Sequence, residues 1–61
     1  MNERKILTVY AIGEKGDRFR VAGYEEKTAL QVVNDPTVKH ICKAVKLIAV
    51  NKNGETVAES N

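Results

Sequence analysis

Apolar residues fill both alternating positions of the first extended segment, Lys5–Ile12. The two sets of side chains are Ile6, Thr8, Tyr10 and Ile12 in one, and Leu7, Val9 and Ala11 in the other. A strand with apolar residues on both faces is typical of the centre of a sheet or of an interface. This segment is therefore predicted to be a strand that is covered on both sides.

A polar bend at Gly13–Asp17 is followed by a second β-prone run, Arg18–Gly23, and the two runs predict a hairpin. In the second run, two apolar residues alternate with two arginines: Phe19 and Val21 on one face, and Arg18 and Arg20 on the other. The pattern predicts a half-buried strand that ends at Gly23, with Phe19 in the core and a basic outer face.

A second hairpin is predicted near the C-terminus, where Val45–Val50 and Glu55–Glu59 flank the turn Asn51–Gly54. Asparagine and glycine are the residues that most readily adopt positive φ, so Asn-Gly indicates a tight reversal between strands.

A short helix is predicted between the hairpins, over about Glu26–Asn34. Two starts are consistent with the sequence. Thr28 and Gln31 fit a capping box, whereas Glu25 and Glu26 would favour an earlier first turn through the helix dipole. Three residues of this helix are expected to face inward: Ala29, Leu30 and Val33. Proline disfavours helical geometry in the preceding residue, so the helix should stop before Pro36.

Asp35 as a cap and Pro36 at the first helical position predict a further helix. Four apolar residues then follow helical spacing: Val38, Ile41, Cys42 and Val45. In that conformation, three lysines share another face: Lys39, Lys43 and Lys46. The alternative is one long strand from Val38 to Val50, which would project beyond a monomer and favour chain exchange with a second copy.

These elements predict an α+β fold of the form ββα(α)ββ, with a small antiparallel sheet from two hairpins that flank a helical segment. We expect one domain over residues 1–61, with Met1–Arg4 frayed. A chain of this size has a thin core, and its single cysteine allows no internal disulfide. Pairing through an exposed strand edge would enlarge the core, so a homodimer and a monomer both remain open.

The composition, 43% hydrophobic and 30% charged, is typical of a globular protein and not of a disordered one. The apolar run Ile6–Ile12 is too short to span a membrane, and no small-residue cleavage site follows it. Together with the lone cysteine, this predicts a cytoplasmic protein that does not insert into a membrane.

No residue pattern indicates catalysis. The only histidine and cysteine, His40 and Cys42, are two apart, a spacing that does not bring the side chains together. We expect His40 at the surface and Cys42 in the core, and two ligands are too few for zinc. The glycines lie in bends and form no phosphate-binding loop. The chain is therefore predicted to be no enzyme, with no cofactor, metal or small-molecule substrate.

The distribution of charge is more informative. No acidic residue lies between Pro36 and Gly54, and Arg18 and Arg20 add a second basic strip. The predicted partner-binding residues are Arg18, Arg20, Lys39, Lys43 and Lys46. The hypothesis is a small accessory or regulatory module that binds a protein partner, or itself, through its sheet edge and basic face. The alternative is a nucleic-acid-binding protein that contacts the phosphate backbone through the same residues.

Overall fold

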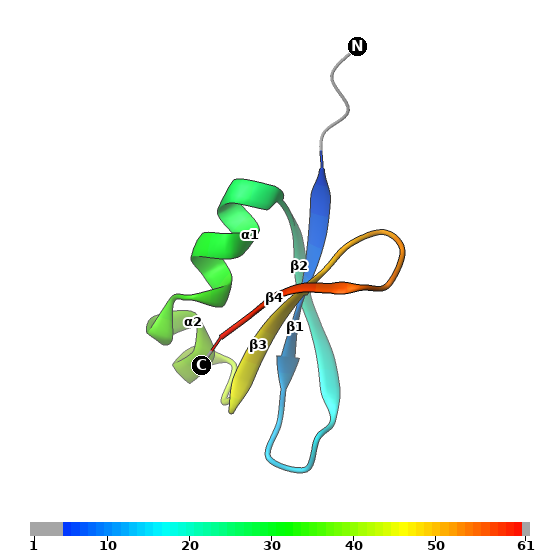
Figure 1. The fold of residues 1–61 in the computed structure, drawn as a ribbon. Coiled ribbons are helices and arrows are strands. Elements are labelled where there is room, and N and C mark those ends of the chain that lie inside the picture. Colours follow the sequence, from blue (N-terminus) through cyan, green and yellow to red (C-terminus); the bar gives the residue numbers. More distant parts are fainter. Residues whose placement is uncertain (1–4, 61) are drawn as a thin grey trace.

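A four-stranded antiparallel sheet with two helices on one of its faces forms the structure, a computed structural model that describes residues 5–60 (Figure 1). The expected frayed segment Met1–Arg4 lies outside the described residues. The elements are β1 (Ile6–Ile12), β2 (Arg18–Glu25), α1 (Glu26–Val33), α2 (Pro36–Ile41), β3 (Lys46–Val50) and β4 (Thr56–Glu59). The strand order is β2-β1-β3-β4, so β1 is central, and the predicted α+β class is confirmed.

Both predicted hairpins are present. In the first, the backbone N–H of Gly13 donates to the carbonyl of Asp17 at 2.9 Å. In the second, the side-chain oxygen of Asn51 accepts from the backbone N–H groups of Asn53 and Glu55, each at 2.9 Å. Gly54 has a φ of 84°, a conformation that few residues other than glycine adopt easily. The Asn-Gly turn is therefore built from its own side-chain and backbone groups.

The second strand is longer than predicted, because it does not end at Gly23. Tyr24 and Glu25 remain in the ladder opposite Leu7 and Ile6. The backbone N–H of Glu26 then donates to the carbonyl of Lys5 at 3.0 Å. The start of β1 therefore holds the chain extended up to the first residue of α1.

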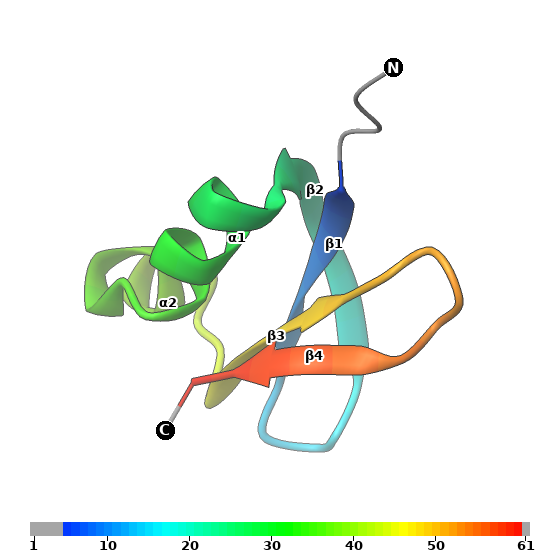
Figure 2. The same ribbon diagram turned by 45° about the horizontal axis from the view of Figure 1, so that its top comes forward.

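The sheet is strongly twisted, and each edge strand contains a bulge. Between β1 and β2 the register shifts beside Val9 and Tyr10, so Val21 of β2 is an extra, unpaired residue. Between β3 and β4 it shifts beside Ala49 and Val50, so Val57 of β4 is the extra residue. Bulges bend a strand and increase its local twist. Accordingly, the β3–β4 hairpin crosses β1 at a wide angle (Figures 1 and 2).

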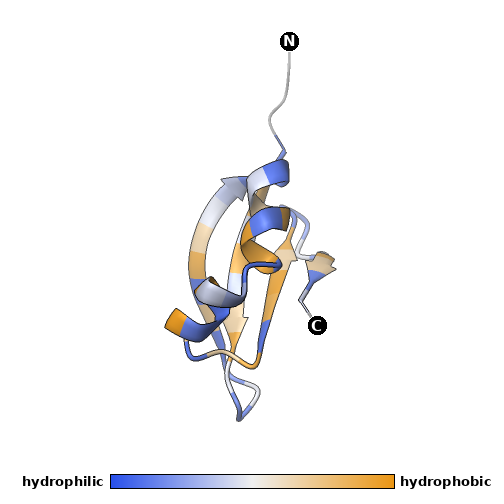
Figure 3. Ribbon diagram, turned by 90° about the vertical axis from the view of Figure 1, so that its left-hand side faces the viewer, coloured by the Kyte–Doolittle hydropathy of each residue, from blue (hydrophilic) through white to orange (hydrophobic). Residues whose placement is uncertain are grey.

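The core lies between the sheet and α1. Figure 3 shows the apolar segments of β1 and β3 behind the helices. The buried cluster consists of Leu7, Val9, Ala11, Ala29, Val33, Leu47 and Ala49. Three of these seven residues are alanines, so α1 lies close to the sheet and the core is thin.

The helix α1 begins at the earlier of the two predicted starts. Its N-cap is Glu25 and Glu26 lies in its first turn, so the alternative prediction of a start with a capping box at Thr28 is wrong. The cause is the direct strand-to-helix junction at Glu26. Ala29 and Val33 face the sheet as expected. Leu30 is 39% exposed, because it lies at the edge of the helix face that carries these two residues.

The second helix has the predicted start but is shorter than expected. The carboxylate of Asp35 accepts from the backbone N–H of Thr37 at 2.9 Å, and Pro36 occupies the first position. After Ile41 the chain turns through Lys43, whose φ is 52°. The alternative of one long strand from Val38 to Val50 is therefore wrong.

This turn is a Schellman motif with lysine at the position that glycine usually occupies. The N–H of Lys43 donates to the carbonyl of His40 at 3.1 Å, and that of Ala44 donates to Lys39 at 3.0 Å. The apolar stripe is therefore interrupted. Val38 and Cys42 pack against the core, whereas Ile41 is 72% exposed and Val45 is also exposed. The predicted three-lysine helical face does not form, because Lys43 and Lys46 lie beyond the helix.

The expectation that Phe19 is a core residue is also wrong. Phe19 pairs with Ala11 and therefore lies on the helix side of the sheet, yet it is 56% exposed. The reason is the placement of α2, which packs against α1 more than against any strand. The end of β2 that carries Phe19 consequently has no helix above it.

Replacing Lys43 with glycine is expected to stabilise the protein by about 0.5–1 kcal/mol, because glycine adopts positive φ without the Cβ clash. Urea unfolding followed by circular dichroism measures the change. Lys43→Ala is the matched control, since it removes the charge but keeps the strained backbone. A gain of equal size in Lys43→Ala would contradict the backbone explanation.

Candidate interaction surface

The face of the sheet opposite the helices is covered by no element of the described chain. We call it the uncovered face. Alternation along the strands and the register of the ladder place on it Ile6, Thr8, Tyr10 and Ile12 of β1, Lys46, Ile48 and Val50 of β3, and Arg18 and Arg20 of β2. Because apolar residues also fill the other side of β1 and β3, these two strands have the composition of strands buried on both faces.

The apolar side chains on the uncovered face are larger than many of those under the helices. The helix side of β1 and β3 includes Ala11 and Ala49, whereas the uncovered side includes Tyr10, Ile12 and Ile48. An arrangement that places bulk on the side without a helix is unusual for a sheet that faces only water, since such a face usually carries polar residues.

The centre of the uncovered face is already shielded within the monomer. Ile48 and Val50 are each 6% exposed, although no helix lies over them. Tyr10 pairs directly with Ile48, and Thr8 pairs with Val50. At the margin, Ile6 remains 49% exposed and packs near Gly23.

One cross-strand row on this face runs from a cation to a carboxylate. Arg20 is opposite Tyr10, Tyr10 is opposite Ile48, and Ile48 is opposite Glu59. We call these four residues the charged row: Arg20, Tyr10, Ile48 and Glu59. It crosses all four strands, with its positive end on β2 and its negative end on β4.

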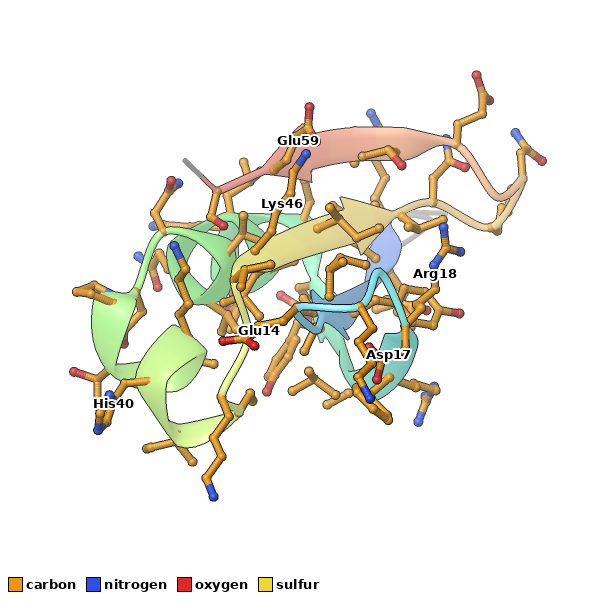
Figure 4. The ribbon with its side chains drawn as sticks, turned by 90° about the horizontal axis from the view of Figure 1, so that it is seen from below. Glu14, Asp17, Arg18, His40, Lys46 and Glu59 are labelled. Atoms are coloured by element: carbon orange, nitrogen blue, oxygen red, sulfur yellow. The ribbon has the colours of Figure 1, made fainter. Side chains whose placement is uncertain are left out.

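Two contacts fix the charges beside this row. The guanidinium carbon of Arg18 lies 5.1 Å from the centre of the Tyr10 ring, within the range of a cation–π interaction. The Lys46 ammonium forms an ion pair with the Glu59 carboxylate. Figure 4 shows the Lys46–Glu59 pair and Arg18 in different parts of the sheet. On the uncovered face, Arg18 and Arg20 therefore lie on β2, whereas Glu59 lies on β4 and is paired with Lys46 of β3. Glu25, opposite Ile6, adds a carboxylate at the other end of β2.

The five predicted partner-binding residues fall into two groups. Arg18, Arg20 and Lys46 belong to the uncovered face. Lys39 belongs to α2, and Lys43 lies in the turn that follows it. These elements are on the helix side, so the structure brings three of the five residues to one face and separates the other two from them.

The sequence reasoning missed Ile48, Val50 and Glu59 as members of the same face. The signal was present, because all four residues of Leu47–Val50 are apolar, as in the first strand. What the sequence did not provide was the β1–β3 pairing, which aligns the two apolar strands and places Glu59 at the end of the charged row.

Clefts also open on the described part of the molecule, and the lining of one of them includes Ile6 of the uncovered face. The first, of about 330 Å³, lies between the start of β1 and the β3–β4 turn; its lining includes Ile6, Glu26, Asn51 and Val57. The second, of about 220 Å³, includes Asn34, Lys39 and Ser60. Asn51 and Ser60 both serve the fold, since Asn51 builds the turn and the hydroxyl of Ser60 accepts from the N–H of Leu47 at 2.8 Å.

The histidine and the cysteine that were rejected as a catalytic pair line neither of these clefts. His40 is exposed on α2, and Cys42 is a half-buried free thiol that packs against the core. Among residues 5–60, no group of three or more histidine, cysteine, aspartate or glutamate residues could hold a metal ion. Within the same range, no helix is long and apolar enough to cross a membrane.

Comparisons with protein-family models, with curated proteins and with solved structures found no match for this chain.

Proposed function

We propose that the protein is a small non-catalytic interaction module that binds a protein surface, of a different protein or of a second copy, through its uncovered face. The observation that supports this proposal is the apolar character of β1 and β3 on the side without helices. A partner would remove the exposed parts of Ile6, Tyr10 and Ile12 from water, and burial of apolar surface stabilises association.

The uncovered face is a better docking surface than the sheet edges that the sequence suggested. Each edge strand contains a bulge, β2 carries two arginines, and β4 has only four residues. Bulges, charges and short edge strands are features that oppose pairing with another chain. We therefore base the proposed function on the face.

Nucleic acid is the second candidate, supported by Arg18, Arg20 and Lys46 on one face. Two contacts make it the weaker one. Lys46 is already paired with Glu59, and Arg18 lies over the Tyr10 ring on which a base would stack. A nucleic-acid complex of this kind would weaken steeply as salt rises, because phosphate contacts release counterions.

A photo-crosslinking amino acid at Ile6 is expected to form a covalent adduct with a protein in cells, whereas the same probe at Leu30 is not. Ile6 is on the uncovered face and Leu30 is on α1, and both are partly exposed apolar positions. Gel electrophoresis and mass spectrometry identify the adduct: twice the chain mass indicates self-association, and another mass indicates a different protein. Sensitivity of the adduct to nuclease would favour the second candidate. Equal adducts from both positions, or none from either, would contradict the proposal.

We further propose that the module acts in the cytoplasm. The single cysteine supports this, because a free half-buried thiol is typical of a reducing compartment. Cell fractionation followed by immunodetection of the chain would test it.

A further inference from the structure

We propose that the partner of the uncovered face is the uncovered face of a second copy, packed sheet to sheet across a two-fold axis parallel to the strands. This inference rests on the proposed function, since it names the occupant of the same surface. It is carried by the charged row, whose ends have opposite signs.

A two-fold axis along the strands reverses the lateral order of the second sheet. It places β2 of one copy over β4 of the other, and β1 over β3. Arg20 would then lie over Glu59 of the second copy, and Tyr10 over its Ile48. The same contacts repeat on the other side of the axis, which is what a self-complementary interface requires.

The sign of the charges favours this axis over a perpendicular axis through the same row. A two-fold axis that is perpendicular to the strands and passes through the charged row would place β2 over β2, and therefore Arg20 beside Arg20. Like charges across an interface oppose association, whereas complementary ones determine its register. The ion pair with Lys46 does not prevent the new contact, because a carboxylate has two oxygens and can accept from both cations.

A sheet-to-sheet dimer requires side chains that span the gap between the sheets and a sizeable buried area. Aligned sheets pack about 10 Å apart, a distance that opposing arginine and glutamate side chains can span together. A standard interface buries about 800 Å² per partner, roughly a sixth of the 4700 Å² accessible surface of the chain. The exposed apolar area of this face is supplied by Ile6 at its margin and by the half-buried Tyr10 and Ile12, whereas Ile48 and Val50 are already shielded.

Reversing either charge of the row is expected to weaken the dimer, and reversing both is expected to restore it. Sedimentation velocity and light scattering on the full chain should show a dimer that dissociates on dilution. Arg20→Glu and Glu59→Lys should each raise the dissociation constant by about tenfold or more, because each change places like charges together at two symmetric contacts. The double variant should return close to the original value.

An equimolar mixture of the two single variants gives the sharpest readout. In a mixed dimer, both contacts again join opposite charges, so the mixture should associate more tightly than either variant alone. This recovery cannot result from a folding defect, and circular dichroism verifies the fold of each variant. Lys27→Glu on α1 and Glu14→Lys in the first bend make the same changes in net charge outside the uncovered face and should leave the dimer unchanged.

Glu59→Lys also removes the ion pair with Lys46. That loss persists in the mixed dimer, so recovery in the mixture cannot be attributed to the ion pair. A chain that stays monomeric at high concentration would overturn this inference, and so would a dimer that is insensitive to both reversals. In either case, an adduct between the probe at Ile6 and a different protein would preserve the proposed function. Absence of any adduct from the probe at Ile6, with a different protein or with a second copy, would overturn both.

Discussion

Replacing Leu47 with alanine is expected to unfold a large fraction of the protein at room temperature. Leu47 is fully buried and pairs with Ala11 in the centre of the sheet. A buried leucine-to-alanine change costs about 2–5 kcal/mol, and a chain of this length has a total stability of about 3–9 kcal/mol. The loss is therefore comparable to the whole stability of the fold.

Urea unfolding followed by circular dichroism measures this effect. Leu30→Ala is the matched control, because the same atoms are removed from a leucine that is 39% exposed. It should cost much less than the change at Leu47, since the side chain is already partly hydrated. Equal losses at the two positions would contradict the description of the core.

Replacing Ala29 with leucine is expected to destabilise the protein by about 1–3 kcal/mol, although leucine is the more hydrophobic residue. Ala29 is fully buried where α1 meets the sheet, and Ala11 and Ala49 are buried in the same cluster. Small residues on both sides set a short helix-to-sheet distance, so a larger side chain must push α1 away or adopt a strained rotamer.

The control for this substitution is Gln31→Leu, which adds an apolar side chain to an exposed position of the same helix. It should change the free energy of unfolding by no more than about 0.5 kcal/mol. Thermal unfolding by differential scanning calorimetry distinguishes the two variants. Stabilisation by Ala29→Leu would mean that α1 is packed loosely enough to accept a leucine.

Local signals in the sequence predicted the elements well. Asn51–Gly54 fixed a turn through groups that lie within it, and Asp35 with Pro36 fixed the start of α2. The errors arose where a segment distant in the chain determines where an element begins or ends. The carbonyl of Lys5 extends β2 and starts α1 before Thr28.

The candidate surface shows the same division. The basic strip of β2 could be read from alternation alone, because Arg18 and Arg20 share a face of one strand. The charged row could not, because it requires the pairing of β1 with β3 and of β3 with β4. Lys43 lies outside the uncovered face for a local reason that the sequence does not indicate. It occupies a position at the end of α2 where glycine is usual, so no glycine marks the end of this helix.

The pairing of β1 with β3 also determines how the molecule folds. Each hairpin consists of contacts between near neighbours in the chain, but the ladder from Thr8–Val50 to Ile12–Lys46 joins segments more than thirty residues apart. Closing that loop costs chain entropy that is recovered only when α1 covers the same two strands. An isolated two-stranded hairpin is at best marginally stable in water. The two hairpins should therefore gain and lose their structure together, in one cooperative transition.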